Sequence, residues 1–283
     1  MTRHEDQPRL AELLRRTDAI ADGAPPADTI PTGFPTLDRL LGGGLRRGDL
    51  VVLGGDVGTG KSALALAIAL RAAEEGNAVT YLSGEMSPTR VHERLLAIEG
   101  RASIDALRSG AVDEATRASL GVVALRAQQT LPVVRPMPID GSDSLDAEAK
   151  LDPKPVLLVV DSLQHIHGNG APAENNAQAV LALKELAMRN HVAVLVTAHL
   201  PELPPARENL RPQLHDFGAV GAIKQLADVV LGLFREEIYH PVPGSEGAAE
   251  LAILKNRHGP TTYIDLYFYK QWLRFEDMVD PDR

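Results

Sequence analysis

Eight residues in the first quarter of the chain have the types and spacing of a phosphate-binding loop. From Gly55 to Ser62 they read Gly-Asp-Val-Gly-Thr-Gly-Lys-Ser, which fits the P-loop spacing G-x-x-x-x-G-K-[ST]. The glycines let the backbone wrap closely enough for its N–H groups to point at phosphate oxygens. We expect Lys61 to reach the β- and γ-phosphates and the Ser62 hydroxyl to bind Mg²⁺. The expected nucleotide-binding residues are Gly55, Asp56, Val57, Gly58, Thr59, Gly60, Lys61, Ser62 and Ala63.

Two carboxylates stand at the ends of apolar runs that suit buried strands. Residues 155–160 lead into Asp161, which is the Walker B pattern, and we expect Asp161 to hold the Mg²⁺ shell. Residues 78–82 lead into Ser-Gly-Glu-Met-Ser, so Glu85 would lie at the carboxyl end of a strand, near the P-loop. Glu85 could orient or deprotonate an attacking water molecule there. The alternative is a glutamate that caps the following helix.

Regular elements must flank these residues for the chemistry to work. The run Leu-Val-Val-Leu at residues 50–53 suits a buried strand, and residues 63–70 are strong helix formers, so the loop joins a strand to a helix. The helix N-terminus adds the positive end of its dipole to the phosphate site. Another apolar run at residues 192–197 predicts a further buried strand, with His199 just after it. Its imidazole could hydrogen-bond phosphate or water, although a lone histidine is more often structural.

Composition limits the classes of protein that remain. The 283 residues suffice for one large α/β domain with an appendage, and the absence of cysteine excludes disulfides and cysteine-based zinc sites. We expect a cytoplasmic protein without a membrane partner, because no stretch approaches the roughly twenty apolar residues of a membrane span and the N-terminus lacks a signal-peptide core. The net charge of −9 provides no global attraction to nucleic acid, so DNA binding would need a local basic strip or one formed on assembly.

An amphipathic helix and a linker precede the main domain. Residues 8–22 have helical periodicity, and a stretch rich in proline and aspartate at residues 22–28 ends it. The apolar stripe of this helix consists of Leu10, Leu13, Leu14 and Ala21. The helix either folds back on its own domain or docks on a neighbouring subunit. We therefore divide the chain into linker helix and linker, residues 1–29, and one ATPase domain, residues 30–283.

Two further segments extend the pattern beyond the P-loop. Residues 30–45 contain Pro-Thr-Gly-Phe, then Leu-Asp, then a run of glycines, and residues 255–261 read Lys-Asn-Arg-His-Gly-Pro-Thr. With the P-loop, these segments resemble the RecA-type ATPases, above all the DnaB-type replicative helicases, with the RadA and KaiC groups as neighbours. The resemblance covers about residues 8–278. It implies a RecA-like α/β fold: a doubly wound, mainly parallel sheet with antiparallel C-terminal strands, plus the linker helix.

The resemblance also implies roles for individual residues. Glu85 matches the catalytic glutamate, and His199 stands where the family usually has a glutamine that senses the γ-phosphate. Lys255 and Arg257 match basic residues that reach the γ-phosphate bound to the neighbouring subunit; the alternative for both is an exposed strand edge. The last implied contacts are with adenine, from Arg235 and Tyr239.

Two loops correspond in the family to the channel that holds nucleic acid. The first, residues 167–172, has no lysine or arginine, so Gly168 and Asn169 could offer only backbone N–H contacts. The second, residues 200–218, carries Arg207 and Arg211, which could contact phosphates. At the end of this loop, the family's Arg-Glu-Ser is replaced by Gly-Ala-Val at residues 218–220.

These observations support two hypotheses of function. The first is an ATP- and Mg²⁺-dependent ring, a homohexamer, that acts as a helicase or translocase on single-stranded DNA in replication or repair. The second is an ATP-gated switch or assembly factor that acts on a protein partner without unwinding, and the missing arginine of the second channel loop favours it. Loader or primase-like proteins are the implied partners of the first.

Overall fold

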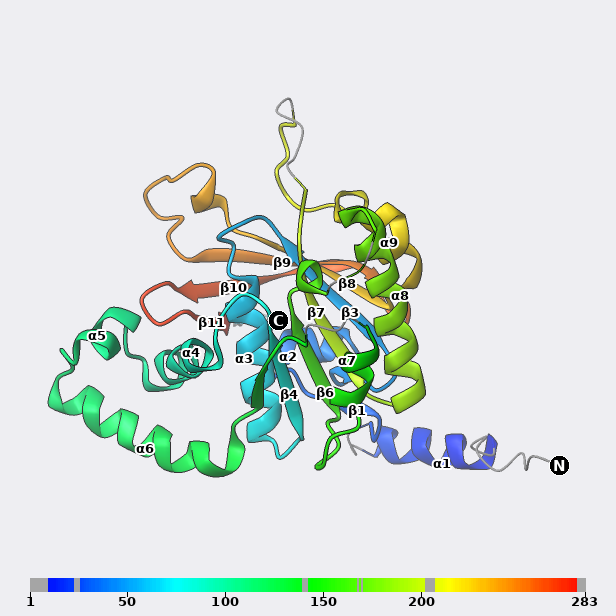
Figure 1. The fold of residues 1–283 in the computed structure, drawn as a ribbon, viewed down its shortest axis with the longest axis horizontal. Coiled ribbons are helices and arrows are strands. Elements are labelled where there is room, and N and C mark those ends of the chain that lie inside the picture. Colours follow the sequence, from blue (N-terminus) through cyan, green and yellow to red (C-terminus); the bar gives the residue numbers. More distant parts are fainter. Residues whose placement is uncertain are drawn as a thin grey trace.

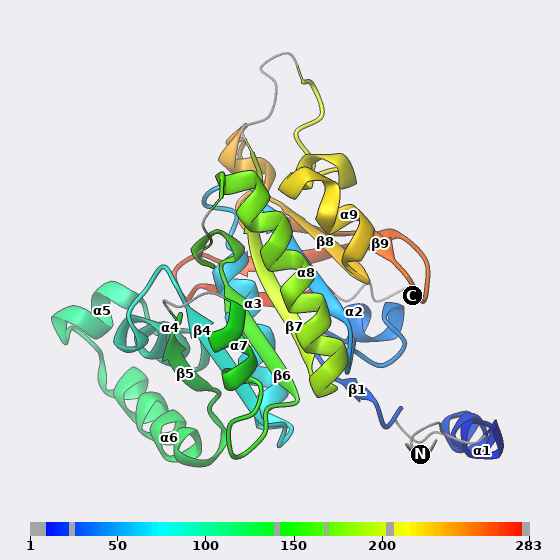
Figure 2. The ribbon, with the colours of Figure 1, turned by 45° about the vertical axis from the view of Figure 1, so that its right-hand side comes forward.

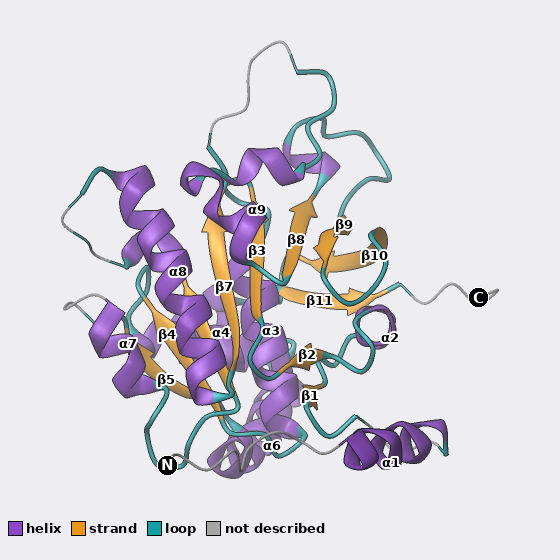
Figure 3. Cartoon of the chain, turned by 90° about the vertical axis from the view of Figure 1, so that its right-hand side faces the viewer, coloured by secondary structure: helices purple, strands orange, loops and turns teal. Residues whose placement is uncertain are grey.

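A computed structural model describes residues 10–22, 26–138, 142–166, 168, 170–201 and 207–278. In these residues a nine-stranded sheet has the strand order β11-β10-β9-β8-β3-β7-β6-β4-β5. Figure 3 shows β7, β3 and β8 side by side in this sheet. Its strands are β3 (Leu50–Gly55), β4 (Val79–Ser83), β5 (Val133–Pro136), β6 (Leu157–Asp161), β7 (Ala193–His199), β8 (Val229–Phe234), β9 (Ala248–Asn256), β10 (Thr262–Tyr269) and β11 (Arg274–Asp277). A separate two-stranded sheet pairs β1 (Thr29–Ile30) with β2 (Leu45–Arg46).

The sheet is parallel from β5 to β8 and antiparallel from β8 to β11. Parallel strands need crossover connections, and helices supply them. The helices are α1 (Leu10–Ala21), α2 (Pro35–Leu40), α3 (Lys61–Glu74), α4 (Pro88–Gly100), α5 (Ile104–Ser109), α6 (Glu114–Thr130), α7 (Ser142–Glu148), α8 (Pro172–Asn190) and α9 (Ala222–Leu226). The predicted α/β class, with a mainly parallel sheet and antiparallel C-terminal strands, is confirmed.

Helices cover both faces of the central parallel strands, so β3, β4, β6, β7 and β8 are buried along almost their whole length, whereas the edge strand β5 is largely exposed. Val51 and Leu53 of β3 pack in one cluster with α3, whereas Leu50 and Val52 face the other way, into a cluster with α8. Figure 2 shows α8 crossing one face of the sheet and α3 behind it. Because β3, β4, β6 and β7 run parallel, their carboxyl ends lie on the same side of the sheet, where ligands bind in open α/β sheets.

Helix α1 projects away from this body (Figure 1). Its described side chains, residues 14–22, are all exposed, and Leu14 and Ile20 keep 58% and 45% of their surface accessible. This stretch therefore does not fold back on its own domain. None of the helices in the described part of the chain is both long and apolar enough to span a membrane.

Candidate nucleotide-binding site

The P-loop joins β3 to α3, as the sequence predicts. Gly58 and Gly60 have φ angles of +81° and +101°, a left-handed conformation that favours glycine. The loop is tied to itself, because the buried Thr59 donates from its hydroxyl to the carbonyl of Asp56 at 2.8 Å. The phosphate cradle is therefore already shaped in the protein.

Lys61 lies across this cradle. Its side chain is 6% exposed, and its Nζ donates to the Asp56 carbonyl at 2.9 Å. Burial lowers the pKa of Lys61, against the opposing effect of the negative charges on Glu85 and Asp161. A desolvated ammonium with a carbonyl partner gains a stronger, charge-assisted bond when a phosphate oxygen replaces that carbonyl.

Ser62 and Asp161 meet, as the Mg²⁺ prediction requires. The Ser62 hydroxyl donates to Asp161 Oδ1 at 3.1 Å, and Asp161 is 1% exposed. The same carboxylate accepts bonds from Thr197 Oγ1 at 2.5 Å and from the hydroxyl of the buried Tyr81 at 2.7 Å. Hard oxygen ligands of this kind suit Mg²⁺, which keeps several water molecules and uses one or two protein ligands. The residues present therefore fit the expected metal.

Glu85 follows the carboxyl end of β4 and meets residues from β7 and from the end of β6. His199 Nε2 lies 2.6 Å from Glu85 Oε1, and the Ser162 hydroxyl donates to the same oxygen at 3.1 Å. Burial alone would raise the pKa of Glu85, but the bonds from His199 and Ser162 outweigh it and lower that pKa. Helix α4 begins after Ser87 without a side-chain cap, so Glu85 interacts with the strand tips and does not cap the helix.

His199 also lies beside the P-loop. It pairs with Gly55 in the register of β7 with β3, and its backbone N–H donates to Gln164 Oε1 at 3.2 Å. His199 therefore lies beside the start of the P-loop through its backbone and contacts the glutamate through its imidazole. The structure brings together five predicted residues at the carboxyl ends of the parallel strands: Lys61, Ser62, Glu85, Asp161 and His199.

Lys255 and Arg257 lie on the opposite side of the sheet's strands, near the amino end of β3. Asn256 of β9 pairs with Val229 of β8, and Val229 pairs with Val51, near the amino end of β3. The P-loop follows the carboxyl end of β3, about five residues or roughly 17 Å away at 3.3 Å per residue. These two cations therefore cannot complete the pocket of their own subunit.

Both cations are held by local contacts. Lys255 Nζ donates to the carbonyls of Lys224 and Gln225 at 2.8 and 3.3 Å, at the end of α9. Burial and the charge of Arg257 lower the pKa of Lys255. Arg257 Nε lies 2.9 Å from Asp228 Oδ1, while half of the arginine side chain stays exposed. Asp228 thus holds Arg257 at Nε, and the exposed half of the arginine side chain can contact another subunit.

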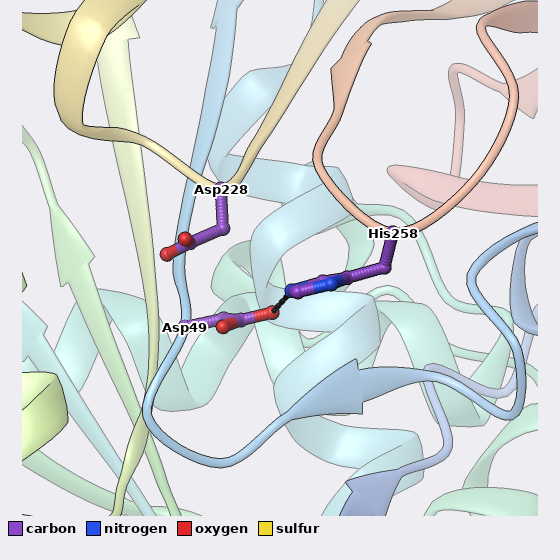
Figure 4. Close-up of side chains that lie close together, drawn as sticks. All are labelled: Asp49, Asp228 and His258. Atoms are coloured by element: carbon purple, nitrogen blue, oxygen red, sulfur yellow. Dashed lines mark ion pairs between the residues drawn. The ribbon is translucent and has the colours of Figure 1, made fainter.

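Asp228 is the buried anchor at the amino end of β3. Its side chain is 3% exposed, and its Oδ2 accepts bonds from Lys184 Nζ at 2.5 Å and the Leu50 N–H at 2.8 Å. Figure 4 shows Asp228 beside Asp49 and His258, whose Oδ2 and Nε2 atoms are 3.3 Å apart. These three residues have the types of metal ligands, but both oxygens of Asp228 already face cations or an N–H group. We therefore assign the group a structural role.

The first prediction concerns this anchor. Asp228→Asn should lower the free energy of unfolding by about 3–5 kcal/mol, because it leaves the largely buried Lys184 without its counter-charge. Urea unfolding of the nucleotide-free protein measures the change. The matched control is Asp28→Asn, which breaks the half-exposed pair with Arg46 and should cost less than about 1 kcal/mol. Equal losses in the two variants would show that the Asp228 cluster has no special role in stability.

Comparison with known proteins now identifies the family. The model of the DnaB-like helicase C-terminal domain matches residues 29–277. The chain belongs to this family. It is 32% identical over 280 residues to the replicative DNA helicase DnaB of Geobacillus stearothermophilus, covering 94% of the chain and 59% of that helicase. It is 30% identical over 262 residues to the replicative DNA helicase DnaC of Bacillus subtilis, covering 88% and 56%. The chain thus spans little more than half the length of these curated relatives.

Solved structures share the DnaB-like fold. A DnaB-like replicative helicase, solved in a study of its interactions with primase, superimposes with a TM-score of 0.85 at 22% identity, covering 97% of this chain and 68% of that one. A second solved structure, that of an ATPase domain, gives 0.84 at 24% identity, covering 97% of this chain and all of that domain. At these identities the likeness concerns the fold alone.

In the DnaB-like domain, Arg235 and Tyr239 contact the P-loop. Arg235 is 4% exposed, donates to the Gly58 carbonyl at 3.2 Å, and lies 4.3 Å from the centroid of the Phe268 ring. The Tyr239 hydroxyl donates to Asp56 Oδ2 at 2.8 Å. Burial and this bond raise the pKa of Tyr239. Both residues therefore hydrogen-bond to the P-loop itself, and their contact with adenine stays a prediction.

The arginines of the second channel loop are engaged within the chain. Arg207 NH1 bonds to Asp216 at 2.6 Å, and Arg211 makes a two-pronged contact with Glu250 at 2.5 and 2.6 Å. In the first loop, Gly168 is exposed and its carbonyl accepts from the Asn175 side chain at 3.3 Å. Asn169 lies outside the described residues. DNA contacts from these four residues stay predictions.

Several functional neighbours were not foreseen from the sequence. Tyr81 and Thr197 lie within apolar runs that predict buried strands, and nothing in those runs indicates that their hydroxyl groups contact the site. Asp228 stood before a strand and His165 stood after one, without a recognisable spacing to their partners. A partial signal existed for Ser162, because it directly follows Asp161 at a strand tip.

Proposed function

We propose that the chain is the ATP-hydrolysing part of a ring-forming DNA helicase or translocase that acts on single-stranded DNA in replication or repair. One observation carries the proposal: the P-loop and the pair Lys255 and Arg257 lie at opposite ends of neighbouring strands in one sheet. A pocket that needs both can be completed only by a second subunit. Repeating that head-to-tail contact gives a ring when the rotation between subunits closes, and six copies is the number we propose.

Each pocket would hold ATP with Mg²⁺. The P-loop binds the phosphates, and Ser62 and Asp161 hold the metal, which neutralises charge on the β- and γ-phosphates when bound. Glu85 accepts a proton from the attacking water, and His199 contacts the γ-phosphate from the neighbouring strand tip. Arg257 and Lys255 of the adjacent subunit stabilise the charge of the transition state.

Helix α1 supports the same assembly. Its exposed apolar side chains, such as Leu14 and Ile20, have no cover on their own domain, so a neighbouring subunit is the surface we propose for them. We also propose a cytoplasmic location and a loader or primase-like partner. The primase partner follows from the DnaB-like structure solved in a study of such interactions.

A second function, an ATP-gated switch on a protein partner, is favoured by one observation. The arginines of the second channel loop already form ion pairs with Asp216 and Glu250, so their charges are partly neutralised before any DNA arrives. A motor that grips phosphates needs cations that can exchange partners. The half-exposed Arg211 can do so at low cost, whereas Arg207 is 13% exposed.

The second prediction separates the two functions. Single-stranded DNA should stimulate ATP hydrolysis several-fold, and the stimulation should fall as salt is raised, because phosphate contacts release counterions. Steady-state ATPase assays with and without an oligonucleotide, over a salt series, measure it. Arg211→Ala should weaken the stimulation and leave the DNA-free rate unchanged. ATP hydrolysis that ignores DNA at every salt concentration would favour the switch.

A further inference from the structure

A chain of hydrogen-bonded side chains runs through the oxygen of Glu85 that contacts His199. His165 Nδ1 lies 3.0 Å from Ser162 Oγ, and Ser162 Oγ lies 3.1 Å from Glu85 Oε1. His199 Nε2 reaches the same Oε1 at 2.6 Å. The four side chains come from three different strand ends, so only the fold brings them together.

The hydrogens of this chain can be assigned. A serine hydroxyl has one hydrogen to donate and lone pairs to accept. Because Glu85 is an acceptor when ionised, Ser162 donates to it and accepts from His165, whose hydrogen must be on Nδ1. Ser162 is fully buried, so water does not compete for its hydroxyl. His165 thereby fixes the direction in which the hydroxyl points.

The backbone leaves room for this arrangement. A Cβ at Gly84 would lie 2.5 Å from the Cβ of His165, closer than side chains pack. The Gly84 N–H donates to the Asp161 carbonyl at 2.6 Å, which brings the strand tip carrying Glu85 against the turn that carries Ser162 and His165. The absence of a side chain at residue 84 is therefore what allows His165 to stand behind Ser162.

We propose that Ser162 and His165 are positioning residues for Glu85, which they hold with one oxygen fixed and the other turned toward the water that attacks ATP. Among the described residues, both hydrogen bonds to Glu85 reach Oε1, so Oε2 is the oxygen that can take the water proton. The inference rests on the proposed role of Glu85 as the catalytic base. It adds a hydroxyl and a second imidazole that act only through that carboxylate.

The charges around Glu85 agree with this role. The groups that face it are His199 from β7, His165 through Ser162, and Lys61 from α3. Burial would favour the protonated acid, but the donors lower the pKa of Glu85 and keep it a carboxylate. Positioning within a few tenths of an ångström matters because a misplaced base loses much of its effect.

The test removes the hydroxyl and little else. Ser162→Ala should lower kcat for ATP hydrolysis about tenfold, the effect of one lost hydrogen bond to a charged group, and leave KM for ATP unchanged. His165→Ala should lower kcat in the same way by a smaller factor. Steady-state kinetics of the purified assembly with Mg²⁺ and ATP measure both. The matched control is Ser103→Ala, which removes the hydroxyl that caps α5 and should leave kcat and KM at the parent values.

A double variant decides whether the effect passes through Glu85. In a Glu85→Gln background, Ser162→Ala should cause no further loss of the residual single-turnover rate. The positioning role is wrong if Ser162→Ala keeps the parent kcat, if it raises KM instead, or if it lowers the residual rate of Glu85→Gln by the same factor as in the parent. A fully active Glu85→Gln would overturn the proposed catalytic base itself, which is a separate result.

Discussion

Arg257→Ala is expected to lower kcat for ATP hydrolysis by roughly 10³- to 10⁵-fold, the range typical of arginine fingers supplied in trans. The guanidinium lies near the amino end of β3, remote from the P-loop of its own subunit. Its loss should therefore leave nucleotide binding to that P-loop nearly intact. Steady-state kinetics give kcat, and binding of a non-hydrolysable ATP analogue gives the affinity. Arg189→Ala, which removes an exposed arginine from α8, should change neither.

Mixing two inactive variants tests the shared pocket directly. In a ring that combines Arg257→Ala with Lys61→Ala subunits, some interfaces pair an intact P-loop with an intact Arg257. Activity should therefore return on mixing, although each variant alone is inactive. A protein that stays monomeric with nucleotide, or an Arg257→Ala variant as fast as the parent, would contradict the shared pocket.

Glu85→Gln should lower kcat by roughly 10²- to 10⁴-fold, because a carboxamide cannot accept the proton of the attacking water. The amide keeps the shape of the side chain and can still bond to Ser162 or His199, so ATP binding and assembly should persist. Single-turnover hydrolysis and analogue binding measure the two properties. Glu174→Gln, an exposed residue near the start of α8, is the matched control. Parent activity in Glu85→Gln would assign the base to another group.

The central features of fold and site were predictable because each of them is encoded in a short, continuous stretch of sequence. The P-loop is one continuous segment, and the strands that lead into Asp161 and Glu85 are mainly apolar runs whose carboxyl ends must lie on the same side of a parallel sheet. The antiparallel C-terminal strands were predictable from the family resemblance. Each of these inferences needed only a local pattern and one rule of sheet geometry.

Side-chain partners were not predictable in the same way. Arg211 pairs with Glu250, 39 residues later, and only the placement of β9 beside β8 brings the two together. Lys184 and Asp228 are 44 residues apart, and they meet because α8 packs across β7 and β3, while Asp228 stands just before β8, the strand next to β3. A carboxylate before a strand reads as a turn residue until its neighbours are known. Such pairs depend on register and helix placement, which residue types alone do not specify.

The six buried residues of β3 have a further consequence in a ring built as proposed. One end of this strand carries the glycine loop of one pocket, and the other end meets Asp228, which anchors the arginine of the next pocket. A strand hydrogen-bonded on both sides deforms little, so it acts as a strut between successive sites. In such a ring, a shift of the loop on nucleotide binding would reach the adjoining interface through this strand.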